Sequence, residues 1–149
     1  MTLLILGLVL FLGMHSVRVF ADDFRTARIQ AWGANGWKAA YSVVSIAGFA
    51  LIAYGYGLSR AAPVDLWNPP VWTRHLASLL TLPAFILLFA PKIPGSHLRA
   101  KLGHPMVLGV KLWAVAHLLA NGRLADVLLF GGFLLWATLS YRAARARDR

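Results

Sequence analysis

Five apolar segments of near-membrane-spanning length constrain the fold of this chain more than any other feature of its sequence. They lie at about residues 2–20, 39–58, 75–90, 105–121 and 124–141. A helix needs about 20 mostly apolar residues to cross the hydrocarbon core of a bilayer, and a backbone in lipid must satisfy its hydrogen bonds internally. The sequence therefore predicts an all-α, polytopic membrane helix bundle with five transmembrane helices, forming one domain over residues 1–149.

The composition supports a membrane protein and excludes several kinds of chemistry. Apolar residues make up 59% of the chain, above the roughly 45–50% of soluble domains. A formal charge of +10 would indicate a nucleic-acid partner in a soluble protein, but here we expect no nucleic acid and basic residues in loops. The absence of cysteine excludes disulfides and thiolate ligands. The chain also lacks Glu, and we expect no Asp inside a span, which disfavours a carboxylate-based proton pump.

The distribution of Lys and Arg predicts the orientation of the chain. Basic residues follow the first apolar segment rather than precede it, so we interpret that segment as an uncleaved helix and not as a signal peptide. With five spans, the first loop, the third loop and the C-terminal tail share one side of the membrane. That side carries eleven Lys and Arg residues, against three on the other. The positive-inside rule therefore predicts an N-terminus outside and a cytoplasmic C-terminus.

Two pairs of spans share short motifs. Residues 6–15 and 108–117 both fit L-G-x-x-L-aromatic-x-x-x-H, while GFALIA at 48–53 has a counterpart in GFLLWA at 132–137. The matched spans cross the membrane in opposite directions, which is typical of a three-plus-three inverted repeat. We therefore expect a truncated repeat without its sixth helix, in which a pseudo-two-fold axis relates His15 to His117.

Two histidines lie deep inside predicted spans, where titratable groups are costly and usually functional. His15 is in the first span and His117 in the fourth, and we find no carboxylate close to either in the sequence. Such a side chain needs a partner or a metal, and haem iron takes neutral imidazoles from helices of this kind. We expect both to be haem or metal ligands. On depth alone, pairings of His15 with His104 and of His75 with His117 stay open.

Two cations are candidates for binding an anion beside these histidines. Lys111 lies about two turns inside the fourth span, so its stem can snorkel to the interface or its ammonium can pair with a buried anion such as a haem propionate. Arg18 is the other candidate propionate partner. A simpler interpretation is that Arg18 is one of the basic residues that set the orientation of the chain in the membrane. Three further histidines adjoin loops, and we interpret them as residues of the membrane interface: His75, His97 and His104.

Four stretches that cover nearly the whole chain resemble the NnrU family. They are LVLFLGMHSVR (8–18), GWKAAYSVVSIAGFALIAYGYGLSR (36–60), VWTRHLASLLTLPAF (71–85) and GHPMVLGVKLWAVAHLLANG (103–122). The resemblance implies a small multispan protein of the bacterial cytoplasmic (inner) membrane, associated with denitrification. Family members usually continue through another membrane helix, so by this resemblance the chain is a fragment or a short paralogue.

The NnrU family is in turn similar to the plant 15-cis-zeta-carotene isomerase, a membrane enzyme that uses haem b. One haem ligand of that enzyme lies in a His-Ser pair of the first helix, which matches His15-Ser16. The other lies thirteen residues after a His-Pro pair, which matches His104-Pro105 and hence His117. The resemblance therefore implies haem b as cofactor and His15 and His117 as its ligands.

These expectations lead to one main function and two alternatives. The main one is a haem-b-binding protein of nitrogen-oxide metabolism or an isomerase-like enzyme, with an apolar small molecule as partner besides the lipid bilayer. The alternatives are a cofactor-free accessory or assembly protein, in which the polar residues only organise helix packing, and a small-solute transporter, which the repeat alone suggests.

The charge asymmetry yields the first testable prediction. A reporter that is active only in the cytoplasm should be active when fused after Arg149, because the side with eleven basic residues is retained inside. A reporter that is active only in the periplasm should be silent there, and activity of that reporter would contradict the predicted orientation.

Overall fold

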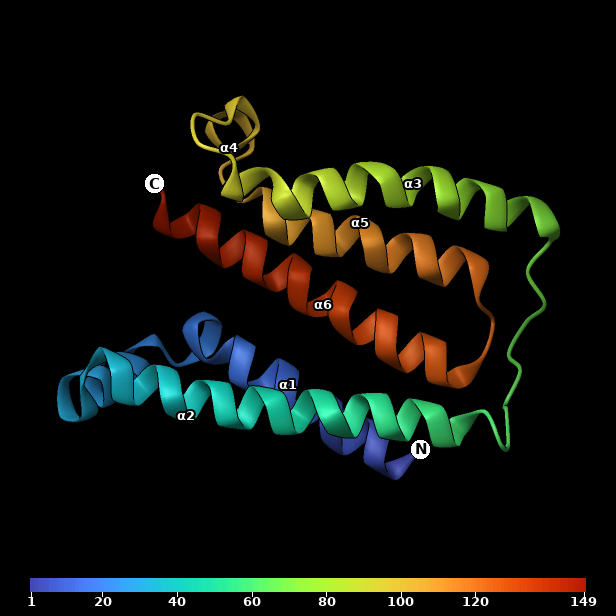
Figure 1. Cartoon of the computed structure of the whole chain (residues 1–149), viewed down its shortest axis with the longest axis horizontal. Coiled ribbons are helices and arrows are strands. Elements are labelled where there is room, and N and C mark those ends of the chain that lie inside the picture. The colour runs from blue at the N-terminus through green and yellow to red at the C-terminus, as the bar shows by residue number, and fades with distance from the viewer. The chain divides into compact units, whose positions relative to one another are not determined.

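The computed structural model describes residues 1–149 as an all-α chain (Figure 1). Its main helices are α1 (Thr2–Phe20), α2 (Asp22–Ser59), α3 (Val71–Phe89), α5 (Pro105–Ala120) and α6 (Leu124–Arg147). A 3₁₀ turn, η1 (Ala90–Lys92), and a six-residue helix, α4 (His97–Leu102), connect α3 to α5. The predicted all-α fold class is confirmed.

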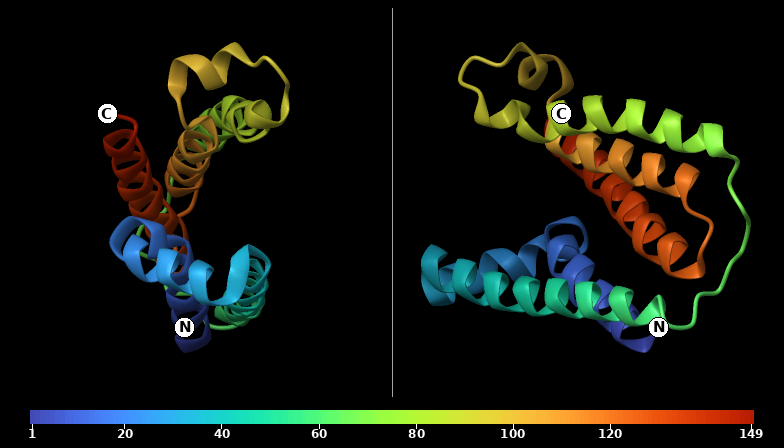
Figure 2. Two further views of the ribbon diagram at one scale, coloured as in Figure 1. Left: turned by 90° about the vertical axis from the view of Figure 1, so that its left-hand side faces the viewer. Right: turned by 45° about the vertical axis from the view of Figure 1, so that its right-hand side comes forward.

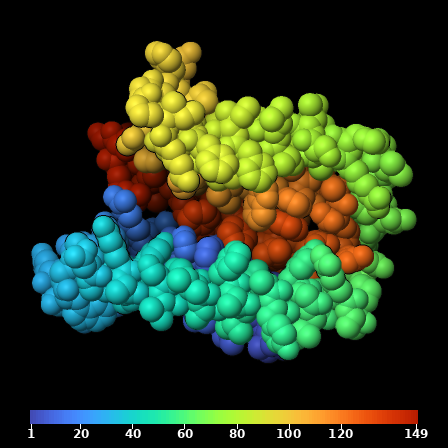
Figure 3. Space-filling model, in the orientation of Figure 1, coloured from blue at the N-terminus to red at the C-terminus, as the bar shows by residue number.

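Most of these helices suit a bilayer. Four segments are long and apolar enough to cross a membrane, namely Thr2–Phe20, Asp22–Ser59, Val71–Lys92 and Leu124–Arg147. The fifth helix, α5, is apolar but shorter, at 16 residues. The surfaces of α2 and α3, both visible in Figure 3, carry exposed large apolar side chains, among them Val43, Ile46, Phe49, Leu79, Leu82 and Phe85. Exposed apolar surface of this kind fits lipid, so the chain is a multi-pass membrane protein.

The first loop differs from the expected polar connection. Helix α2 begins at Asp22, almost directly after α1, and its backbone departs from helical geometry at Gly33. Figure 2 shows that the early part of α2 runs in a different direction from the rest of the helix. Gly33 has φ 76° and ψ 164°, a backbone conformation that residues with a Cβ rarely adopt. The Arg28 guanidinium lies 5.4 Å from the ring centroids of both Phe24 and Trp32. Residues before Gly33 therefore form a helix of their own, and the spanning part of α2 follows it.

The chain divides into two compact units, Met1–Pro63 and Val64–Arg149. The first unit is the α1–α2 pair. In the second, α5 packs against both α3 and α6. The segment after the first unit is tied to the α5–α6 turn, since the Leu66 amide donates to the Gly122 carbonyl at 2.7 Å and the Leu124 amide donates to the Val64 carbonyl at 2.8 Å.

Glycines allow α1 and α2 to approach closely. A Cβ atom on Gly7 would lie 2.6 Å from the Ile52 nitrogen, and one on Gly48 would lie 2.7 Å from the Phe11 nitrogen. Small residues at such crossings let backbones meet, which is how membrane helices gain packing energy without a hydrophobic driving force. The two helices are therefore held together chiefly by close backbone contact.

The sequence repeat is not matched by repeated packing at its glycines. Gly109 corresponds to Gly7 in the shared motif, yet its Cβ would meet the Ala84 carbonyl oxygen and Leu88 of α3, whereas Gly7 faces the helix that follows it in the chain. The two-fold relation between the matched spans stays a prediction.

Substitution of these glycines tests the packing. We expect Gly7→Ala to lower the stability of the folded protein by about 1–3 kcal/mol, because the added methyl group overlaps the α2 backbone. The matched control is Gly13→Ala in the same helix, where nothing lies within 4 Å of the added Cβ. It should be neutral or gain up to about 1 kcal/mol of helix propensity. Thermal unfolding in detergent, followed by circular dichroism, measures both. Equal melting temperatures for the two variants would contradict the proposed contact.

Candidate functional site

His15 lies on the face of α1 that packs against α2. Its position continues the buried stripe of Leu4 and Leu8 at helical spacing. The ring is half-buried and stacks on Phe11, with 4.2 Å between the ring centroids. Tyr41 of α2 lies 5.1 Å away on a tilted plane. The His15 imidazole therefore sits in aromatic surroundings within the first unit.

A backbone hydrogen bond fixes the orientation of this ring. Nδ1 of His15 is 2.7 Å from the Phe11 carbonyl oxygen. Because a carbonyl only accepts, Nδ1 carries a proton and donates it. In the neutral ring the lone pair is then on Nε2, the nitrogen farther from the backbone. Histidines that ligate metals usually donate their other ring N–H in this way.

His117 lies near the end of α5 and faces α6. Its ring stacks on Phe130 with 4.3 Å between centroids and 6° between the planes. Trp113, one turn earlier, meets the ring edge-on at 5.2 Å and also contacts Phe130 and Phe133 of α6. The Asn121 amide donates to the His117 carbonyl at 2.8 Å. The His117 imidazole thus contacts two aromatic rings, and a third, Phe133, packs against Trp113.

Asp126 corrects the expectation that no Asp lies inside a span, and it places a carboxylate near His117 in space. It lies in the first turn of α6, is 2% exposed, and is close enough to His117 to act on it electrostatically. Phe130, which stacks on His117, is one turn further along the same face. The short Asn121–Arg123 turn that brings the start of α6 against the end of α5 is the signal that could have revealed this neighbour.

A groove of about 340 Å³ opens between α3 and α5 beside His117. Arg74, Ser78 and Thr81 line it from α3, and His117 and Asn121 line it from α5. The Ser78 and Thr81 hydroxyls donate to carbonyls of their own helix at 3.0 Å and 2.7 Å. Arg74 therefore places a cation in the same groove as His117, a role that its sequence position does not reveal.

The remaining candidates are more dispersed. Arg18 is exposed in the last turn of α1, and Lys111 is half-buried on α5 without an acidic partner. His75 is exposed on α3 and does not line the groove beside His117. His104 is hydrogen-bonded to Asp148 at 2.8 Å. His15 and His117, which the sequence singles out, are thus the two histidines whose rings contact aromatic side chains from within an apolar helix.

Comparison with known proteins supplies the family. Neither the curated proteins nor the solved structures give a match to this chain. The model of the family described as NnrU protein matches residues 3–149, which is nearly the whole sequence. The match includes the helices that carry His15 and His117 and every residue of the α3–α5 groove. On this evidence, the chain belongs to the NnrU family.

Proposed function

We propose that this NnrU-family protein binds haem b in the membrane, with His15 and His117 as its two axial ligands. The observation that carries the proposal is the hydrogen bond from His15 Nδ1 to the Phe11 carbonyl, since it places a proton on Nδ1 and leaves the lone pair of the neutral ring on Nε2, where it could bind iron. His117 adds a second imidazole, held among aromatic rings.

The donor set fits haem better than a bare metal ion. No group of three or more His, Cys, Asp or Glu side chains comes together in the structure. A bare ion needs several such donors, whereas haem iron needs only one or two axial ligands from the protein. The aromatic rings beside His15 and His117 suit a flat, apolar macrocycle and would exclude water from it.

Several cations are available for the propionates of haem. Arg74 shares a groove with His117, while Arg18 lies one turn after His15 and Lys111 lies on the same helix as His117. Charge-assisted hydrogen bonds from such groups are stronger than neutral ones. In this proposal the chain orients the two imidazoles, binds the propionates and keeps the site dry.

Bound haem supplies an iron centre for electron transfer or small-ligand chemistry. The resemblance to a denitrification-associated family supports a role in nitrogen-oxide metabolism at the bacterial cytoplasmic membrane. The resemblance to the isomerase supports an alternative reaction, the cis–trans isomerisation of an apolar substrate. The second candidate function is a cofactor-free assembly protein. The stacking of His117 on Phe130 favours it, because the His117 ring can then serve as core packing without binding a metal.

The spectrum of the purified protein tests the proposal. Protein from haem-sufficient cells should show the low-spin, six-coordinate spectrum of bis-imidazole haem. His15→Ala and His117→Ala should each abolish that spectrum or make it high-spin. The control His97→Ala, an exposed residue at the start of α4, should change nothing. A colourless wild-type protein would favour the assembly role, and wild-type haem content in both variants would contradict the ligand assignment.

Asp126 provides a second test of the same site. A carboxylate beside a ligating histidine raises the basicity of the ring and favours the ferric state. We therefore expect Asp126→Asn to raise the haem midpoint potential and to weaken haem affinity by about tenfold or more. Asp65→Asn, which removes an exposed carboxylate of the same unit, is the matched control. Redox titration measures both, and an unchanged potential in Asp126→Asn would show that Asp126 does not act on the ligand.

A further inference from the structure

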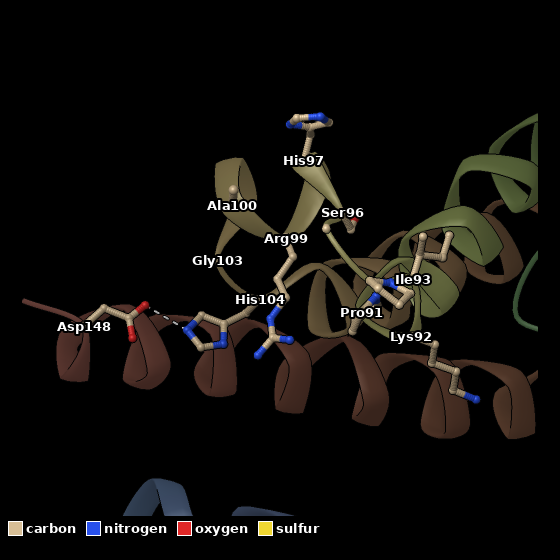
Figure 4. Close-up of a pocket in the computed structure, with 12 residues that line it drawn as sticks. Pro91, Lys92, Ile93, Ser96, His97, Arg99, Ala100, Gly103, His104 and Asp148 are labelled. Carbon is tan, nitrogen blue, oxygen red and sulfur yellow. Dashed lines mark hydrogen bonds and ion pairs between the residues drawn. The ribbon is translucent and has the colours of Figure 1, made fainter.

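A pocket of the second unit lies where α3 ends and α5 begins, at the opposite end of α5 from His117. It has a volume of about 710 Å³ and is formed by the segment from Pro91 to Gly103 together with His104 and Asp148. Figure 4 shows the His104 ring reaching Asp148 with the Arg99 side chain beside it, while the His97 ring points away. Two basic side chains, Lys92 and Arg99, and two histidines, His97 and His104, therefore line the pocket.

The charges in this pocket are unbalanced. Lys92 and Arg99 line it along with His104, and Asp148 is the only acidic residue in its wall. Asp148 is hydrogen-bonded to His104 at 2.8 Å, and the Arg145 guanidinium lies 3.8 Å from the same carboxylate oxygen. The carboxylate is 43% exposed. The Asp148 carboxylate thus lies, partly exposed, among the basic side chains of the pocket.

Exposed apolar side chains occur in the segment that forms the pocket and directly before it in the chain. Ile93 lines it and is 60% exposed, and the adjacent Leu98 and Phe89 are also exposed. The Lys92 ammonium lies 5.0 Å from the Phe89 ring centroid. Since α3 ends and α5 begins here, the pocket is at a membrane boundary. Cations next to exposed apolar residues at such a boundary match an anionic headgroup attached to acyl chains.

We propose that this pocket binds the phosphate group of an anionic phospholipid, and that Asp148 is an internal competitor for it. Arg99 and Lys92 would donate to the phosphate oxygens as charge-assisted hydrogen bonds, and the lipid would displace Asp148 from His104. The acyl chains would lie along the exposed apolar residues at the end of α3. A soluble phosphate compound has the same headgroup chemistry but gains nothing from Ile93, Leu98 and Phe89.

Native mass spectrometry of the full-length protein in detergent tests the site. Phosphatidylglycerol should be retained as one bound molecule, and phosphatidylcholine should not. The Lys92→Gln/Arg99→Gln double variant should lose about 30-fold in affinity for phosphatidylglycerol, roughly fivefold for each cation. Lys38→Gln/Arg147→Gln removes the same charge from exposed positions outside the pocket, and it should retain wild-type affinity within about twofold.

The Asp148→Asn variant distinguishes lipid binding in this pocket from general electrostatic attraction of anionic lipid to a basic protein. It should bind phosphatidylglycerol several-fold more tightly than Asp23→Asn, which removes an equal charge from an exposed position on α2. Equal losses in the two double variants, or equal affinities in the two Asp variants, would overturn the proposal. Displacement of the lipid by millimolar glycerol phosphate would show that a soluble anion is the ligand instead. Haem content plays no part in these measurements, so they stand independently of the proposed function.

Discussion

The hydrogen-bonding demand of a backbone in lipid is the constraint on which the rest of this structure depends. Helices satisfy the hydrogen bonds of the main chain. Polar side chains within the spans also need partners, and they donate to the carbonyl one turn earlier in their own helix. His15 donates to Phe11, Ser16 to Leu12, Thr81 to Ala77 and Thr138 to Leu134. For hydroxyls this arrangement only hides a polar group. For His15 it also selects the tautomer in which Nδ1 carries the proton.

Much of the fold follows from the sequence, because length and apolarity alone determine which segments can cross a bilayer. The details that depend on tertiary contact do not. The sequence predicts a loop between the first two spans because this segment contains several Arg and Asp residues. In the structure the segment is helical up to Gly33, and Arg28 lies over the rings of Phe24 and Trp32. The repeat motif also does not indicate which helix each glycine packs against. Gly7 and Gly109 occupy the same position in the motif, but Gly7 packs on α2 and Gly109 packs on α3.

The candidate site shows the same division. His15 and His117 are visible in the sequence because they interrupt apolar runs, where a titratable group stands out. Asp126 and Arg74 do not stand out in the sequence. Each lies in the first turn of its helix, where charged residues are common at the membrane boundary. Only the packed α5–α6 turn reveals that Asp126 is buried beside His117. Likewise, 44 residues separate His104 from Asp148, and no local pattern predicts that contact.

We propose that His15 of α1 and His117 of α5 are both ligands of a bound haem. Near-infrared magnetic circular dichroism of the ferric protein tests it most directly, because the energy of the charge-transfer band identifies the pair of axial ligands. The account predicts the band of bis-histidine ligation in the wild-type protein. A band typical of histidine with water, or of histidine with an amine such as that of Lys111, would contradict it.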